Sequence, residues 1–174
     1  MKLIATIRDS DLYVGVTDDD PSNFRIRTAA RAVVFDDLKQ IALLKVNKHG
    51  YYKLPGGGIE EGEDARQALA RELLEEIGCK AEVIGEIGET VQYLNQSQLK
   101  QTSYCYLAKQ IGQKNKPNFE QSELDDGFEI YWARDINDAI ALLLNSKPSD
   151  YRGISITKRD LAILSAAGLS PVLA

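Results

Sequence analysis

The sequence predicts an α/β fold in which helices cover a mixed β-sheet. Two observations favour this class. Strand-like apolar runs stand on both sides of one amphipathic helical segment at residues 64–77, and a further strand pattern is followed by helical ones. Hydrophobic residues make up 44% of the 174 positions, which is enough for one sizeable core. We therefore expect an α/β sandwich with a mixed sheet, preceded by a short N-terminal β extension.

Residues 1–24 are predicted to form this extension as a β-hairpin. Apolar runs at residues 3–7 and 12–16 flank a polar stretch that suits a turn. The acidic run at residues 18–20 lacks the following ligand spacing of a calcium loop, so a plain turn is favoured there. We expect residues 25–174 to form the main domain, including a C-terminal helix. The extension would serve as an accessory sheet, a lid or, through a free strand edge, a contact in a homodimer.

The main domain alternates between strand and helix patterns. Strands are expected at residues 24–35, 40–46, 51–54, 81–87, 102–108 and 129–133. The nearly continuous apolar runs in the first two favour strands that are covered on both faces. Helices are expected at residues 135–144 and 157–167, where apolar residues recur at helical spacing. Residues 110–127 are expected to form a long loop, which is often functional or mobile in a compact domain.

The helical segment at residues 64–77 places three carboxylates on one face. Glu72, Glu75 and Glu76 stand at positions i, i+3 and i+4, within a sector of about 100°. Like charges at this spacing repel one another, so either a cation binds there or the face is fully solvated. Mg²⁺ fits the first alternative because it prefers carboxylate oxygens and bridges them to substrate phosphates. From the helix alone, a solvated surface rich in glutamate stays an open alternative.

A glycine-rich loop directly before this helix favours the cation. Gly56, Gly57 and Gly58 allow positive φ angles and a close approach of the backbone to a ligand. Asp64 suits the N-cap of the helix. Loop and helix together have a recognisable spacing, at Gly57, Glu63, Arg71-Glu72-Leu73, Glu75-Glu76 and Gly78-Cys79. This pattern resembles a complete Nudix box from Gly57 to Cys79, with a small apolar cysteine where the family usually has an aliphatic residue.

The resemblance implies a Nudix-type α/β/α sandwich over roughly residues 25–144. It implies hydrolysis of a nucleoside diphosphate linked to another group, with water attacking a phosphorus atom. The implied metal is Mg²⁺, with Mn²⁺ as a substitute, and the implied ligands are the carboxylates of Glu72, Glu75 and Glu76 and the carbonyl of Gly56. The loop of Gly56, Gly57 and Gly58 would bind this cofactor. Among the catalytic residues Glu63, Arg71 and Glu72, Glu63 would position water or a second ion, and Arg71 would orient the carboxylates.

The resemblance leaves open whether the general base comes from the box or from outside it, and Glu129 is the favoured candidate outside the box. Side chains alternate faces along a strand, so Glu129 would share one side with Tyr131. Glu120 and Glu123 are the alternatives, and each is more readily interpreted as a solvated loop acid. Substrate contacts have two sets of candidates. Phosphate or ribose could be bound by Arg25, Arg27, Arg31, Lys45 and Lys53, although each alone is more often a surface charge. A base could stack on Tyr93, Tyr104, Tyr106 or Phe128, although core packing is the commoner role for each ring.

Composition and charge limit the classes of binding partner that we expect. The net charge of −5 and the pI near 5.0 argue against a nucleic-acid surface, although bound metal can reverse the charge locally. No apolar stretch is long enough for a bilayer and the N-terminus does not resemble a signal peptide, so neither a membrane partner nor export is expected. Cys79 and Cys105 lack metal or redox spacing and are expected to be buried, reduced thiols of a cytoplasmic protein.

These inferences combine into one predicted function with two alternatives. We expect a cytoplasmic, Mg²⁺-dependent pyrophosphohydrolase of the Nudix type that acts on a nucleotide-type diphosphate. A hydrolase of oxidised nucleoside triphosphates is the alternative within the same chemistry. A nucleotide-sensing domain that keeps the fold without turnover is the alternative from another class, and the intact set of acidic residues disfavours it.

Overall fold

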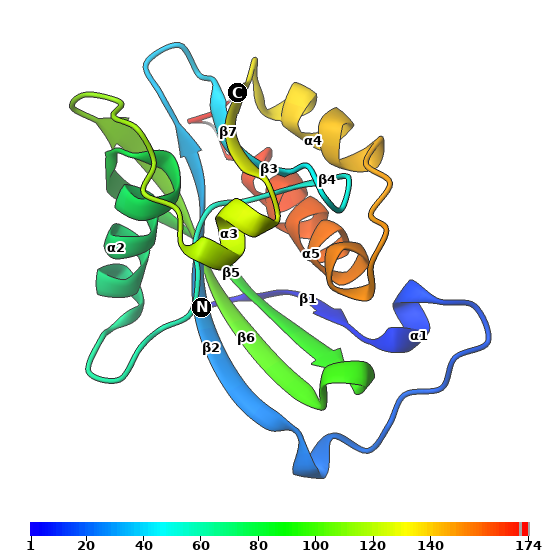
Figure 1. Ribbon diagram of the computed structural model, residues 1–174. Helices are drawn as coiled ribbons and strands as arrows, with labels where there is room; N and C mark the ends of the chain where they lie inside the picture. The colour runs from blue at the N-terminus through cyan, green and yellow to red at the C-terminus, as the bar shows by residue number, and fades with distance from the viewer. Residues whose placement is uncertain (171, 174) are drawn as a thin grey trace.

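The computed structural model describes residues 1–170, 172 and 173, and its centre is one seven-stranded mixed sheet (Figure 1). The strand order is β1-β5-β6-β2-β3-β4, with β7 paired to β3. The strands are β1 (Leu3–Ile7), β2 (Arg25–Phe35), β3 (Ile41–Val46), β4 (Tyr51–Lys53), β5 (Lys80–Leu94), β6 (Leu99–Ile111) and β7 (Phe128–Ala133). The α-helices are α1 (Asp9–Leu12), α2 (Ala65–Ile77), α3 (Gln121–Asp125), α4 (Ile136–Leu144) and α5 (Tyr151–Ala167).

The sheet has two halves that separate beyond a single point of contact. In one half, β5 and β6 form a long antiparallel pair, and β2 lies parallel to β6 along its whole length. In the other half, β4 and β7 flank β3 in antiparallel pairing. The halves meet where Phe35 of β2 pairs with Ile41 of β3. Beyond that pair the two strands diverge, and the sheet splits.

The glycine-rich loop lies along the free edge of β2 in this split. The amide of Ala30 donates to the carbonyl of Gly57 at 3.0 Å, and the amide of Ile59 donates to the carbonyl of Thr28 at 3.1 Å. The amide of Ala32 donates to Pro55 at 3.2 Å. Because the loop satisfies backbone groups that a strand would otherwise pair, it is held in position as an additional edge of the sheet.

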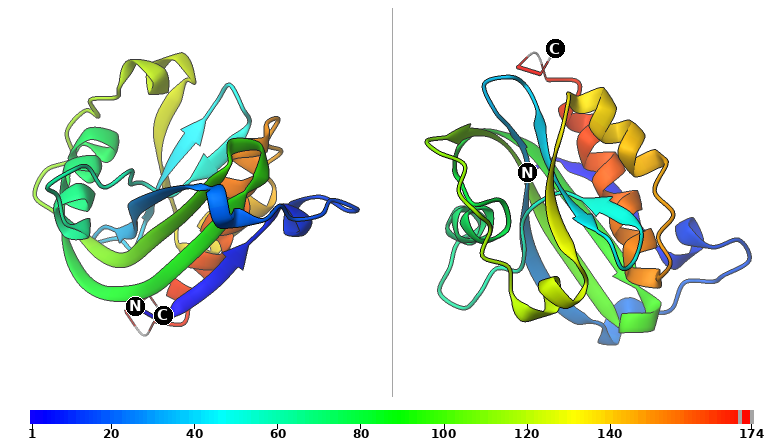
Figure 2. Two further views of the ribbon diagram at one scale, coloured as in Figure 1. Left: turned by 90° about the horizontal axis from the view of Figure 1, so that it is seen from below. Right: turned by 45° about the horizontal axis from the view of Figure 1, so that its top comes forward.

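Helices cover both faces of the sheet, as an α/β/α sandwich requires (Figures 1 and 2). On one face, the apolar side of α2 packs against small residues of β2 and β3, among them Ala30, Ala32 and Ala42. On the other face, α4 and α5 lie side by side over Val33, Phe35 and other residues of the opposite parity. The predicted sandwich and the predicted burial of β2 and β3 on both faces are confirmed.

The predicted N-terminal hairpin is wrong in its second strand. Residues 3–7 form β1, but this strand pairs in parallel with β5 and so belongs to the main sheet. The chain then turns into the short helix α1, where the carboxylate of Asp11 accepts the amide of Arg8 at 2.8 Å. Residues 12–16 find no strand partner among the described residues, and Gly15 there has φ +79°. Residues 1–24 therefore do not form a separate β extension.

Several further boundaries differ from the prediction. The strands expected at residues 81–87 and 102–108 are longer, at Lys80–Leu94 and Leu99–Ile111. Within residues 110–127, the five residues of α3 form a helix instead of irregular loop. The last helix begins six residues earlier than expected because Asp150 caps it, accepting the amide of Gly153 at 3.0 Å. No helix in the described part of the chain is long and apolar enough to cross a membrane.

Candidate active site

Local signals at both ends fix α2 and hence the face that carries the acids. The carboxylate of Asp64 accepts the amides of Arg66 and Gln67 at 2.8 and 2.9 Å, and the side chain of Gln67 returns to the amide of Asp64. Gly78 ends the helix in the left-handed region at φ 65°. With Leu69, Leu73 and Ile77 buried against the sheet, Glu72, Glu75 and Glu76 face the glycine-rich loop.

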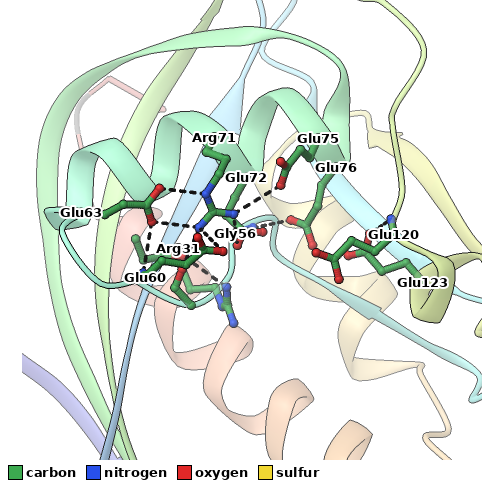
Figure 3. Close-up of polar contacts among 12 residues, drawn as sticks. Arg31, Gly56, Glu60, Glu63, Arg71, Glu72, Glu75, Glu76, Glu120 and Glu123 are labelled. Atoms are coloured by element: carbon green, nitrogen blue, oxygen red, sulfur yellow. Dashed lines mark hydrogen bonds and ion pairs between the residues drawn. The ribbon is translucent and has the colours of Figure 1, made fainter.

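Arg71 is the centre of an ion-pair network at this face (Figure 3). Its guanidinium contacts the Glu63 carboxylate through two nitrogens, at 2.9 and 3.0 Å. It also donates to Glu72 at 3.0 Å, to the Gly58 carbonyl at 3.1 Å and, more weakly, to Glu75 at 3.4 Å. The pKa of Glu63 is lowered to about 2, chiefly by the hydrogen bond from Arg71. Arg71 thus holds loop and helix carboxylates together, in the orienting position that the sequence predicts.

Glu76 is held separately, on the inner side of the helix. Only 2% of it is exposed, and its two oxygens accept Lys53 Nζ at 2.8 Å and the Gly56 amide at 2.5 Å. Lys53 itself is 8% exposed and comes from β4, across the split. A buried carboxylate needs such partners because an unpaired charge there would be strongly unfavourable. Sequence reasoning offered Lys53 as one of several possible phosphate or ribose contacts and missed its pairing with Glu76, since no local pattern relates the two positions.

Two glycines of the loop are required by close approach. Gly56 has φ +123°, and a Cβ on it would lie 2.2 Å from the carbonyl oxygen of Ala30. A Cβ on Gly57 would lie 1.9 to 2.4 Å from the carboxyl atoms of Glu72. Any side chain would therefore displace either the β2 contact or the acid itself. The loop forms a cradle whose shape depends on the absence of side chains.

The carboxylates open into a cavity of about 400 Å³. Its lining comes from both sides of the split. Glu72, Glu75 and Glu76 contribute from α2, Glu120 and Glu123 from α3, and the cations Arg27, Arg31, Lys53, Arg71 and Arg152 from β2, β4, α2 and α5. Burial raises the pKa of Glu72 and that of Glu123, and in each case a neighbouring Glu76 adds to the shift. Acids and cations that line one cavity suit a substrate with negative charge that is brought in with a cation.

Glu129 does not line this cavity, so the structure gives no support to its predicted role as general base. The face of β7 that carries Phe128, Ile130 and Trp132 packs toward α2, so Glu129 and Tyr131 point to the opposite face of the sheet. Glu129 is exposed there. The alternation along the strand was predicted correctly, but the sequence does not tell which of the two faces the site occupies.

Glu120 and Glu123 take the place that was expected for Glu129. They lie at the N-terminus of α3, and the Glu123 carboxylate accepts the amide of Glu120 at 2.8 Å. In Figure 3 both side chains extend toward Glu76. Among the predicted phosphate contacts, Arg25 and Lys45 do not line this cavity, whereas Arg27, Arg31 and Lys53 do. Among the predicted stacking aromatics, only Phe128 lines it.

The donor set fits a hard divalent cation in its chemistry. Glu72, Glu75 and Glu76 supply carboxylate oxygens to one cavity, and Gly57 leaves room for Glu72 against the loop backbone. Among the described residues, no group of three or more acidic, histidine or cysteine side chains is already gathered around one point. The reason is visible in the contacts, because Arg71 holds Glu72 and Glu75 while Lys53 holds Glu76. A cation would replace part of these ion pairs.

Comparison with known proteins agrees with this geometry. The family model described as NUDIX domain matches residues 25–148, which is most of the chain. The chain belongs to the NUDIX family. That assignment confirms the resemblance of residues 57–79 and extends it across both halves of the sheet.

Individual relatives give less information about this chain than the family model does. An RNA pyrophosphohydrolase from Ruthia magnifica is 34% identical over 124 residues, which cover 62% of this chain and 69% of the relative. An RNA pyrophosphohydrolase from Sulfurovum is 54% identical over 43 residues, and the match spans only 24% of this chain and 27% of that relative. A NUDIX hydrolase structure from Nitrosomonas europaea superposes with a TM-score of 0.63 at 16% identity, over 82% of this chain and 88% of that one. At that identity the structural likeness establishes the fold alone.

Proposed function

We propose that this chain is a divalent-metal-dependent hydrolase that cleaves the phosphoric anhydride bond of a nucleoside diphosphate linked to another group. The observation that carries the proposal is the cavity in which three α2 carboxylates face the glycine cradle beside Arg27, Arg31 and Lys53. Membership of the NUDIX family and relatives named as RNA pyrophosphohydrolases support it. A diphosphate needs both charge neutralisation and an activated water, and this lining offers groups for each.

The proposed metal is Mg²⁺, with Mn²⁺ as a substitute. Glu72, Glu75 and Glu76 would hold it, with the Gly56 carbonyl as a further ligand. When bound, it would neutralise diphosphate charge and lower the pKa of water. The loop of Gly56, Gly57 and Gly58 would bring its backbone close to the bound group, since it carries no side chains.

The remaining groups would act on orientation and proton transfer. Arg71 would keep Glu63 and Glu72 in fixed orientations through its bidentate and single contacts. Lys53 would release Glu76 and turn its ammonium toward a substrate phosphate in the same cavity. Glu123, whose pKa is raised mainly by burial, and its neighbour Glu120 are the proposed acceptors of the proton from the attacking water.

The test is phosphate or nucleotide release from a panel of nucleotides with and without Mg²⁺. The panel contains nucleoside diphosphate sugars, dinucleoside polyphosphates, oxidised triphosphates and an RNA oligomer with a 5′-triphosphate. We expect Glu75→Gln to reduce turnover about 10³-fold or more with the fold intact, and Glu123→Gln to reduce it about 10²-fold, within the range for lost acid–base catalysis. Glu61→Gln is the matched control, because Glu61 is an exposed carboxylate of the loop that precedes α2 and does not line the cavity.

Each result decides between named alternatives. Near-wild-type turnover by Glu75→Gln would contradict the site. Nucleotide binding without release of any product would favour the sensing domain, and pyrophosphate released from an oxidised triphosphate would favour that class of hydrolase. Turnover of the RNA oligomer would contradict the predicted absence of a nucleic-acid partner, which rests on the acidic net charge alone. The burial of both thiols supports the proposed cytoplasmic location, and the homodimer stays a prediction.

A further inference from the structure

A second cavity of about 290 Å³ adjoins the first on the α5 side of the sheet. Three arginines, Arg27, Arg31 and Arg152, line both cavities and so form their common boundary. Arg25 and Arg159 line only the second one. In Figure 3 the guanidinium of Arg31 extends away from the α2 carboxylates, toward α5. A bound molecule can therefore contact these arginines while another part of it lies beside the acids.

The second cavity has a strongly positive lining. Its lining contains five arginines and no acidic residue. Among the described residues, one ion pair involves any of the five, between Arg159 Nε and Asp160 at 2.7 Å. Asp160 is itself committed, because its second oxygen accepts the amide of Leu54 at 2.8 Å. Arg159 is thus the arginine of this lining with an ion-pair partner in the described structure, while Glu72 and Glu76 act on Arg27 and Arg31 from the neighbouring cavity.

Two of these arginines are buried with donors that bond to nothing in the described structure. Arg31 is 6% exposed; its Nη1 donates to the Ala30 carbonyl at 3.2 Å, while its Nε has no partner. Arg159 is 2% exposed, and its Nη2 has no partner. Burial, followed by repulsion from Arg159, lowers the pKa of Arg31 to about 10. A buried donor that stays unsatisfied costs free energy, and a charged one costs more, so the cluster is built for an anion.

We propose that this cavity binds a phosphate group of the substrate that is separate from the diphosphate held beside the α2 carboxylates. The inference rests on the proposed function, since it names a further part of the same substrate. Guanidinium groups match phosphate oxygens in geometry and charge, and several converge here. A scissile diphosphate alone would occupy the first cavity and leave Arg25, which lines only the second one, without an ion-pair partner among the described residues.

The rest of the lining indicates what carries this phosphate. Leu94, Leu99 and Ile156 give the cavity an apolar wall, and Tyr151 adds an aromatic ring. Gln92 and Gln101 hold two of the arginines, since Gln101 Oε1 accepts Arg27 Nη1 at 3.0 Å and Gln92 Oε1 accepts Arg159 Nη1 at 3.5 Å. The ligand is therefore a phosphorylated nucleoside or sugar, not a free ion. Its phosphate has two sources, a third phosphate in a linear chain or a phosphate ester on the ribose.

Binding measured without turnover tests this inference. Isothermal titration calorimetry in EDTA compares two matched pairs, ATP against ADP for the linear chain, and adenosine 2′,5′- and 3′,5′-bisphosphate against AMP for the ribose ester. We expect the added phosphate to tighten binding at least about tenfold in one of the two arms, and that arm identifies the source. A preference below about threefold in both arms would overturn the inference.

Surface arginines supply variants that leave the fold intact. Arg25 and Arg152 are exposed at the rim, so Arg25→Gln and Arg152→Gln are expected to lose most of the preference. Lys158→Gln is the matched control, because it removes an exposed cation from the same helix as Arg152, outside both cavities, and is expected to keep it. A preference retained in both arginine variants would overturn the inference. Failure of every nucleotide in the hydrolysis panel would overturn the proposed function alone, since the binding preference does not depend on turnover.

Discussion

Removal of the Arg71 guanidinium is expected to destabilise the fold and to disperse the acids of the site. The group contacts Glu63 twice, Glu72 once and the Gly58 carbonyl once. A hydrogen bond to a charged group contributes about 1.5–3 kcal/mol, but Arg71 is 26% exposed, so solvent screens each contact. Arg71→Ala also leaves Glu63 and Glu72 close together without a cation. We therefore expect a loss of about 2 kcal/mol, well below the sum of the contacts.

Thermal and urea unfolding measure this loss. In a chain of this size, about 2 kcal/mol corresponds to a fall of roughly 4–8 °C in Tm. Arg71→Lys should recover little of it, since an ammonium cannot reproduce the two-nitrogen contact with Glu63. Arg66→Ala is the control on the same helix, because Arg66 is exposed and only faces the Tyr106 ring at 5.7 Å. Equal Tm shifts for Arg66→Ala and Arg71→Ala would refute the view of Arg71 as the centre of the network.

Two further predictions concern the cradle and the buried thiols. Gly56→Ala should reduce stability by about 3 kcal/mol or more, because its Cβ would meet the Ala30 carbonyl at a φ that alanine rarely adopts. Gly85→Ala is the control, because the space around Gly85 is open, and it should change stability by less than about 1 kcal/mol. Burial raises the pKa of Cys79 to about 11 and that of Cys105 to about 12. The folded state therefore keeps thiol protons that the unfolded chain releases above about pH 9, so stability should fall by up to about 1.4 kcal/mol per pH unit for each thiol as the pH rises past 9. Urea midpoints from pH 8 to 10 would show this, and an equally steep fall in a variant with alanine at both cysteines would contradict the assignment.

The parts of the site that sequence predicts are those whose causes are local. Helix α2 is fixed by an N-cap at Asp64, a glycine at position 78 and apolar residues at helical spacing. All three signals lie within one short segment of the sequence. The same spacing places Glu72, Glu75 and Glu76 on one face. What these acids contact is settled elsewhere in the chain, as the pairing of Glu76 with Lys53 shows. Such a pair depends on how β4 and α2 are placed relative to each other in the folded sheet. The periodicity of the sequence does not predict that placement.

The failed predictions have the same origin. Residues 3–7 have a strand pattern, but their partner is β5, more than 80 positions later, and not the nearby run at residues 12–16. For Glu129, alternation fixed its parity with Tyr131 but not which face lies over α2. Arg159 and Asp160 form a buried ion pair within a helix whose sequence pattern marks only its apolar positions as core. For β1 and for Glu129, the deciding contact is between elements distant in sequence, and Asp160 likewise accepts the amide of Leu54 from the other half of the chain.

The split in the sheet explains why acids and arginines meet without neutralising one another. Along β2, Ala30 and Ala32 face α2, while Arg27, Arg31 and Val33 have the opposite parity and face α5. Were β2 and β3 paired beyond Phe35, backbone would separate these two faces completely. Because they diverge, the glycine-rich loop occupies the gap and the two cavities share a boundary there. A substrate can then cross the sheet, with one charged group beside the α2 acids and another beside the α5 arginines, and the distance between those groups becomes a determinant of specificity.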